Sequence, residues 1–336
     1  MKPWTFCAAL AASTQVLAGD ALAEIREDGF KWLSENRDIM AEGAIWNDRI
    51  GDGKDRYKTG GMTQSWVFPE TLFLDDRLIP DRVSALELQG RGFIATPDNT
   101  TSGSTINDRA FVQYVGVGAY HRSWGRPKRH SAETTSATET RAGIEIGWQG
   151  DPLPLFEIQE ALHDNTQVTL SPTNTVDSEF LVNLELEGVW RRQTATRFLD
   201  LDIAPFVRVS TGMRENSVRA GADVIIGSSL SARTWNREPA IGALLPGGSK
   251  RRPGLNWAVW IGGDAGFIAS DAFLDGGFVA DGPKVDREDF TFRLRAGLML
   301  EYDPIAIVYS INWLSPEFES QSEGQLIGAV SLKYRF

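Results

Sequence analysis

The 336-residue sequence has one cysteine and no long apolar run. The cysteine, Cys7, lies near the N-terminus, which excludes a disulfide-stabilised fold and a zinc site built from cysteine and histidine. No segment approaches the roughly 18 consecutive apolar residues that a membrane-spanning helix needs, which excludes a helical membrane protein. The net charge of -11 and the lack of any nucleic-acid-binding motif argue against a nucleic acid as partner.

Tryptophan and glycine, by contrast, are plentiful, with 11 and 33 residues. Such numbers are high for a soluble enzyme but natural for a membrane β-barrel. A barrel needs aromatic residues at both membrane interfaces and small residues where strands bend or crowd.

The N-terminus predicts a targeting segment. Lys2 supplies a positive charge, the stretch from Trp4 to Leu17 is weakly apolar, and Ala21-Leu22-Ala23 matches a small-x-small cleavage site. We therefore expect residues 1–23 to be a signal peptide and residues 24–336 to be the mature protein, which then contains no thiol.

Apolar and polar residues alternate along most of the chain, as in β-strands. In the segments Phe180 to Trp190 and Phe290 to Tyr302, one face is apolar and the other carries arginine and glutamate. In a membrane barrel the apolar face contacts lipid and the charged face lines the lumen, which we expect to be filled by ion pairs. Twelve such segments are expected, at 40–48, 59–68, 82–94, 109–120, 139–149, 179–192, 199–210, 215–230, 256–266, 288–302, 304–314 and 324–336.

The final segment alternates from Gln325 to the C-terminal Phe336. A last strand that ends in an aromatic residue is typical of exported bacterial barrels. The sequence thus predicts an all-β protein, a transmembrane antiparallel β-barrel of about 12 strands in the bacterial outer membrane.

The connections expected on the outer side include 49–58, 95–108, 150–178, 267–287 and 315–323. Within 150–178, Asp151 can cap a short helix that has Pro152 as its first residue. Two basic segments, 121–137 and 231–255, fall on the periplasmic side and are long for periplasmic turns. Either a strand is miscounted there, or these loops have a role of their own.

Three histidines offer acid–base chemistry. His121 and His130 fall in the first basic loop, whereas His163 falls on the expected helix at the extracellular rim, one turn after Gln159. A neutral imidazole in that position can act as general base towards water. The alternative is that His163 is a solvated helix residue.

A second candidate cluster lies where the first strand ends and the second begins. A hairpin there brings Asn47, Asp48 and Thr59 together. Their oxygens suit calcium, and an amide can also stabilise an oxyanion. The alternative is ordinary loop chemistry, in which Asn and Asp are simply turn residues.

At this point the chain resembles the outer-membrane lipid A 3-O-deacylases over most of its mature length. The similarity consists of several short motifs in a characteristic order: Asn47-Asp48, Asp55-Arg56-Tyr57-x-Thr59-x-Gly61, Asn107 to Phe111, Gly150-Asp151-Pro152 followed by Gln159-x-x-x-His163, Phe273 to Gly276, and Glu317-Phe318-x-x-Gln321.

The resemblance implies a calcium-dependent hydrolase (cofactor Ca2+) that removes the 3-O-linked acyloxyacyl group of lipid A, or of lipopolysaccharide, in the outer leaflet. It implies that His163 activates water, that Asn47, Asp48 and Thr59 are active-site residues, and that Gln159 supports them. Asp48 would contact the metal. A monomer is expected, with its active site facing the outer leaflet.

The chain departs from this pattern in two places. Asn99 stands where some members have a lysine that can meet lipid phosphates, and Lys58 is a candidate substitute. Trp46 precedes Asn47 where an acidic residue is common.

Two other functions are compatible with the residues. One is a non-enzymatic barrel, either a narrow channel or a structural protein. The other is a serine-dependent outer-membrane phospholipase, although no Gly-x-Ser-x-Gly motif occurs.

Overall fold

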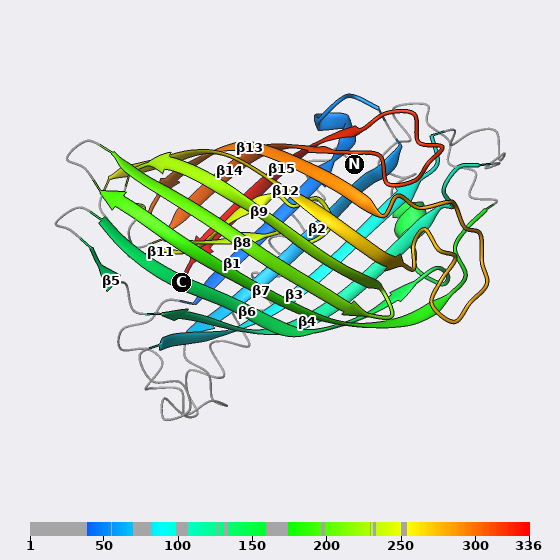
Figure 1. Ribbon diagram of the computed structural model, residues 1–336, viewed down its shortest axis with the longest axis horizontal. Helices are drawn as coiled ribbons and strands as arrows, with labels where there is room; N and C mark the ends of the chain where they lie inside the picture. The colour runs from blue at the N-terminus through cyan, green and yellow to red at the C-terminus, as the bar shows by residue number, and fades with distance from the viewer. Residues whose placement is uncertain are drawn as a thin grey trace.

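Twelve antiparallel strands form a closed barrel, as the sequence predicted (Figure 1). The computed structural model describes residues 39–54, 56–69, 82–98, 107–125, 128–130, 134–158, 174–195, 199–228, 230, 233–249 and 254–336. The expected signal peptide lies outside these residues. The barrel strands are β1 (Met40–Asn47), β2 (Tyr57–Pro69), β3 (Arg82–Thr96), β4 (Val112–Gly125), β6 (Thr134–Gln149), β7 (Glu179–Ala195), β8 (Asp200–Gly212), β9 (Glu215–Gly227), β12 (Leu255–Asp271), β13 (Phe290–Tyr302), β14 (Ile305–Leu314) and β15 (Gln325–Arg335).

Two strand pairs close the barrel. β1 pairs with β15, which joins the first strand to the last, and β4 pairs directly with β6. We call the loop end the end that carries connections 48–56, 97–111, 150–178, 213–214, 272–289 and 315–324, and the turn end the opposite one. Closure satisfies the backbone groups of every barrel strand within the sheet, as lipid requires.

The outer face of the wall is apolar. In β13 the residues from Phe290 to Tyr302 that point outward are mainly apolar and exposed, while the arginines between them are buried. Exposed Phe267 near the loop end and Trp257 near the turn end lie ten positions apart in β12. With about 3.3 Å per residue and a tilt of about 40°, this spacing corresponds to the roughly 25 Å apolar band of outer-membrane barrels.

The lumen is filled with ion pairs, as expected from the charged faces. Arg295 lies between two buried carboxylates, with Nε 2.6 Å from Asp223 Oδ1 and Nη1 2.7 Å from Asp264 Oδ2. A second group surrounds Glu185, whose carboxylate lies within 3.1 Å of three arginines (Arg141, Arg208 and Arg214).

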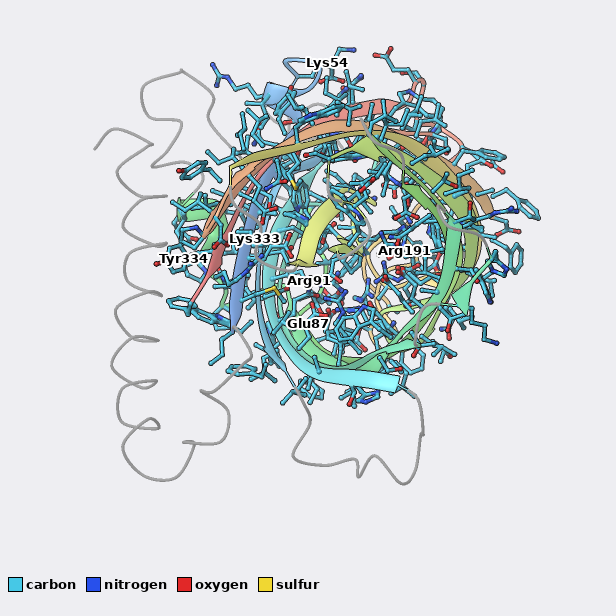
Figure 2. The ribbon with its side chains drawn as sticks, turned by 90° about the vertical axis from the view of Figure 1, so that its left-hand side faces the viewer. Lys54, Glu87, Arg91, Arg191, Lys333 and Tyr334 are labelled. Carbon is cyan, nitrogen blue, oxygen red and sulfur yellow. The ribbon has the colours of Figure 1, made fainter. Side chains whose placement is uncertain are left out.

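The second basic segment, 231–255, is not a simple periplasmic loop. Its strands β10 (Arg233–Arg237) and β11 (Leu244–Ser249) form a separate two-stranded hairpin. Figure 2, a view into the barrel from the turn end, shows this hairpin in yellow inside the ring of strands. Residues of the hairpin pack on the inner wall, with the rings of Trp235 and Trp260 5.3 Å apart. The barrel strands were therefore counted correctly, and the additional hairpin occupies the lumen.

The loop predicted for the first basic segment, 121–137, is shorter in the structure. β4 continues to Gly125, β6 begins at Thr134, and the short strand β5 (Lys128–Arg129) pairs with β6. His121 therefore lies in β4 rather than in a loop, which corrects the sequence-based placement. Backbone pairing does not need apolar side chains, so the strands extend beyond their alternating parts.

Helical structure in the described ranges is limited mainly to the 3-10 turn η1 (Asp48–Ile50) and a short α-helix at residues 155–158. Neither is long and apolar enough to cross a membrane.

We expect Arg295→Met to destabilise the barrel by about 3 kcal/mol, because removing this cation weakens the compensation of two buried carboxylates. The temperature at which the folded barrel loses its compact gel mobility should fall. Arg192→Met, at an exposed position of β7, is the control and should change stability by less than about 0.5 kcal/mol. Equal stability of the Arg295 variant and the native chain would contradict this account of the lumen.

Candidate active site

Four neighbouring strands align one row of residues at the loop end. Asn47 pairs with Gly60, Gly60 with Ile94, and Ile94 with Gln113. Side chains alternate across a strand, and residues next to this row pack in the lumen core (Trp46, Phe93, Ala95, Val112 and Tyr114). The row therefore lies on the outer face of the wall, where a lipid can approach from the side.

Asn47 and Asp48 are fixed by the turn that follows β1. The Asn47 Oδ1 accepts a hydrogen bond from Arg49 N at 2.8 Å and caps η1. A Cβ on residue 60 would lie only 2.9 Å from Asn47 Nδ2, so Gly60 leaves room for the amide. Asp48 is completely buried, and its Oδ2 accepts a hydrogen bond from Arg56 N at 2.7 Å.

A bulge at residues 58–59 sets the position of Thr59. The pairing of β2 with β3 shifts between Tyr57 and Gly60, and Tyr57 has a positive φ of 57°. Thr59 is buried, with its Oγ1 2.6 Å from Thr96 Oγ1. The extra residue lets Lys58 reach Glu317 at the mouth of the barrel instead of the outer face.

Gln113 of β4 holds the start of the short helix against the wall. Its Oε1 accepts a hydrogen bond from Leu155 N at 3.1 Å, and its Nε2 donates one to Asp151 Oδ1 at 3.3 Å. Phe156 of the helix packs on Ile94 and Phe111, with the two phenyl rings 5.8 Å apart.

The predicted helix exists, but it begins later than expected. Its first residue is Leu155, so Asp151 is not its N-cap, and the Asp151 carboxylate accepts from Gln113 instead. Gln159, His163 and Asn99, three residues of the expected site, lie outside the described residues, as does Asp55.

The remaining motif residues meet at the mouth of the barrel. Tyr57, Leu274 and Phe318 form one apolar cluster. Beside it, Glu317 pairs with Lys58 and with Arg109, whose Nη1 lies 3.5 Å from Glu317 Oε2. Burial by itself would raise the pKa of Glu317, but the two cations outweigh it and hold that pKa below its ordinary value.

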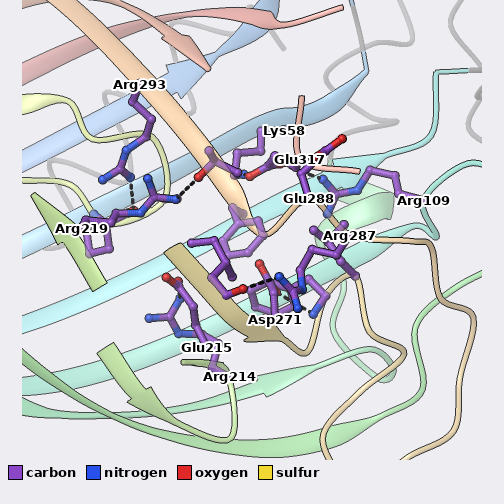
Figure 3. Close-up of a pocket in the computed structure, with 17 residues that line it drawn as sticks. Lys58, Arg109, Arg214, Glu215, Arg219, Asp271, Arg287, Glu288, Arg293 and Glu317 are labelled. Atoms are coloured by element: carbon purple, nitrogen blue, oxygen red, sulfur yellow. Dashed lines mark hydrogen bonds and ion pairs between the residues drawn. The ribbon is translucent and has the colours of Figure 1, made fainter. Parts of the chain in front are cut away.

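A small pocket lies at this mouth (Figure 3). Its walls are strongly charged and include Arg109, Arg214, Asp271 and Glu317. None of Asn47, Asp48 and Thr59 lines it. The pocket lies on the lumen side, whereas the aligned row faces outward, so we place the candidate active site at the row.

In the described part of the chain, no group of three or more His, Cys, Asp or Glu side chains is placed so that it could hold a metal ion. Asp48, the expected metal contact, accepts hydrogen bonds from Arg56 N and, at 3.4 Å, from Gln325 Nε2. A carboxylate keeps further lone pairs beyond these bonds, and side-chain oxygens of this kind suit calcium.

The family described as outer membrane protein LpxR matches residues 5–336 of the sequence. The chain belongs to the LpxR family. This membership confirms the resemblance to outer-membrane lipid A deacylases and supports an outer-membrane location. No curated protein matches the chain.

The solved structure of LpxR from Salmonella typhimurium is similar, with a TM-score of 0.71 and 17% identity over 88% of this chain and 100% of that one. At this identity the likeness shows the fold. The translocator domain of the autotransporter NalP from Neisseria meningitidis has a TM-score of 0.43 and 9% identity, over 96% of this chain and 98% of that one.

Two residues of the candidate site, Thr96 and Gln113, could not be predicted from the sequence. Each is a single polar residue near a strand end, and only the register of β2, β3 and β4 brings it to Thr59 or to the helix. Their position on the outward face, where apolar residues dominate, was the one available signal.

The pairing of Glu317 predicts a pH-dependent loop. Because the folded pKa of Glu317 is lowered, its pairing stabilises connection 315–324 above the ordinary pKa of 4.5 and is lost as the pH falls through the folded value. Amide hydrogen exchange in 315–324, corrected for intrinsic rates, should be constant from about pH 7 to 5 and accelerate below that.

Two variants separate this effect from general acid unfolding. Glu317→Gln should exchange faster already at neutral pH and show no acid step, whereas Glu319→Gln, at an exposed position, should behave like the native chain. An acid step that persists in Glu317→Gln would mean that another group controls the loop.

Proposed function

We propose that this protein is a lipid A 3-O-deacylase that hydrolyses the ester of the 3-O-linked acyloxyacyl group. The observation that carries the proposal is the polar rim site on the outer face of an LpxR-family barrel. Asn47 and Thr59 lie there on β1 and β2, and β2 pairs with β3, against whose Ile94 the short helix packs. An enzyme for a soluble substrate would place such groups in a water-filled cavity. A lipid in the membrane approaches the wall from the side.

The proposed chemistry is direct hydrolysis. His163 takes a proton from water, the resulting hydroxide attacks the ester carbonyl, and the alcohol leaves without a covalent enzyme intermediate. The amide of Asn47 and the hydroxyl of Thr59 are the groups that can donate hydrogen bonds to the carbonyl oxygen as its negative charge develops. Gln159 has a supporting role for His163 in this proposal.

Calcium belongs to this proposal as the cofactor. Asp48 is the residue that would hold it, with the side-chain oxygens of Asn47 and Thr59 as nearby neutral donors. When bound, the ion would supply positive charge for the oxyanion. Since the chain has a net charge of -11, a divalent cation also offers a favourable bridge to an anionic lipid.

We further propose that the protein acts as a monomer and that the loop end faces outward. The chain enters β1 and leaves β15 at the turn end, and the longest of the connections, 150–178, lies at the loop end. Lengths of this kind are typical of outer-membrane barrels with short turns on the periplasmic side. In this orientation the rim site meets the outer leaflet, which contains lipid A.

The alternative functions make different demands. A channel needs an open lumen, whereas this lumen holds ion pairs and a hairpin. A serine hydrolase needs a serine beside a histidine. Within the described ranges, His130 Nε2 lies 2.7 Å from Ser136 Oγ. Both residues lie at the turn end, far along the wall from the family motifs.

Mass spectrometry of lipid A incubated with the purified protein tests the proposal. The native chain with calcium should remove the 3-position acyloxyacyl unit, and chelation should abolish the reaction. Loss of the general base in His163→Ala should slow hydrolysis by about 10²- to 10⁴-fold.

The matched control is His130→Ala, which should retain native activity. If His130→Ala or a serine-directed inhibitor abolishes hydrolysis, the serine-dependent phospholipase is favoured. Unchanged lipid A with folded protein in every condition would leave a non-enzymatic barrel.

Gln113 provides a second test, through positioning of the helix. Gln113→Leu removes the hydrogen bonds to Asp151 and to Leu155 at the helix start, so we expect hydrolysis to slow by about ten- to a hundredfold through misplacement of the helix. Gln64→Leu, the same change on the outer face of β2, should leave the rate unchanged. Rates and heat-dependent gel mobility should be measured together, because a loss of barrel stability in Gln113→Leu would argue against a positioning role.

A further inference from the structure

The hairpin in the lumen is an insertion that the barrel does not need for closure. β9 and β12 pair directly with each other along their lengths, from Gly227 opposite Ala258 to the loop end. The ladder continues past this pair, where Ser228 N donates to Trp257 O at 2.8 Å. A two-residue turn could therefore join Ser228 to Trp257, yet the chain makes a long excursion into the lumen at this point.

The size of the barrel gives this excursion a physical role. Wall side chains fill the interior of a barrel of about 8 strands, while barrels of about 16 strands leave an aqueous channel. A 12-stranded barrel lies between these cases, so additional material is needed to fill it. Trp235 and Leu244 of the hairpin are buried against Trp260 and Met299 of the wall.

Polar contacts fix the hairpin to β7, β9 and β13, which belong to one continuous stretch of the wall. Arg237 is buried, with Nε 3.0 Å from Asp223 Oδ2 and Nη1 2.9 Å from Glu187 Oε1. Arg293 Nη1 donates to Pro239 O at 3.0 Å. These contacts use the same carboxylates and arginines that line the lumen, so the hairpin is part of the ion-pair network.

The tip of the hairpin also closes the mouth pocket. Pro239 and Ala240 line that pocket at the loop end, and the neighbouring Ile241 joins Phe93 and Phe273 in the lumen core. The hairpin thus enters from the turn end and reaches the mouth, where its tip separates the pocket from the space below.

We propose that the hairpin 233–249 is a plug that seals the lumen against ions, and that the barrel without it is an ion-conducting pore. Removing the plug opens the mouth pocket into the central lumen and leaves Asp223 and Glu187 without their shared arginine. This function is independent of lipid A hydrolysis, and its test needs no enzymatic activity.

Conductance across a planar lipid bilayer tests the plug. The native protein should give no current steps. A variant in which an Asn-Gly turn replaces residues 229–256 keeps the β9–β12 ladder, and we expect its ion current to be at least about tenfold larger than that of the native protein. Heat-dependent gel mobility must show that this variant is folded.

A point substitution tests the same idea with the hairpin present. Arg237→Asp places a third carboxylate beside Asp223 and Glu187, so the hairpin should leave its position and intermittent current steps should appear. Lys284→Asp, at an exposed position of connection 272–289, makes the same charge change and should stay closed.

Three outcomes would contradict the plug proposal. They are a steady ion current through the native protein, a folded deletion variant with no more current than the native protein, or a folded Arg237→Asp variant with no more current than Lys284→Asp. The native measurement requires no variant, so a folding failure of the deletion protein would not leave the proposal untested.

Discussion

Backbone hydrogen bonding is the constraint on which the rest of this structure depends. Lipid offers no water to an unpaired N–H or C=O group, so the sheet has to close, through β1 with β15 and β4 with β6. Closure divides the side chains of every strand into two sets. One set faces outward. The other set shares a narrow interior with the inward side chains of the other eleven strands.

That confinement explains the charged lumen. Buried arginines and carboxylates are tolerated because they compensate one another in groups, as around Asp264, which contacts Arg219, Arg293 and Arg295. The hairpin completes the network, since its Arg237 forms ion pairs with both Asp223 and Glu187 of the wall. The interior thus combines an ion-pair network with apolar clusters around the hairpin, while the outward face of the wall is mainly apolar.

A filled lumen also decides where chemistry can occur. The outward row at the loop end is supported from behind by the lumen core, which includes Trp46 and residues of the hairpin tip. In front of it stands the helix held by Gln113 and Phe156. A rigid wall, a bulge at residues 58–59 and an anchored helix together form the rim site on the outward face of the wall, which suits the proposed hydrolysis of a lipid.

Alternation of apolar and polar residues predicted the strands from the sequence alone. Each barrel strand has one face towards lipid and one towards the lumen, so its residues alternate in polarity. All twelve barrel strands and the charged lumen followed from this alternation, whereas the short helix was predicted from Asp151 and Pro152 and the family from the motifs. The pattern failed at β10 and β11, because a hairpin enclosed by the barrel has no face towards lipid and so shows no alternation. It also assigned too much of 121–137 to a loop.

Tertiary structure alone decided which distant residues meet. Lys58 and Glu317 pair across 259 positions, and Thr59 meets Thr96 through a register shift. A side-chain pattern reports which face a residue occupies, but register and strand neighbours depend on how the whole sheet closes. The sequence therefore determined the wall and its two faces, while closure and the bulge at residues 58–59 determined the site.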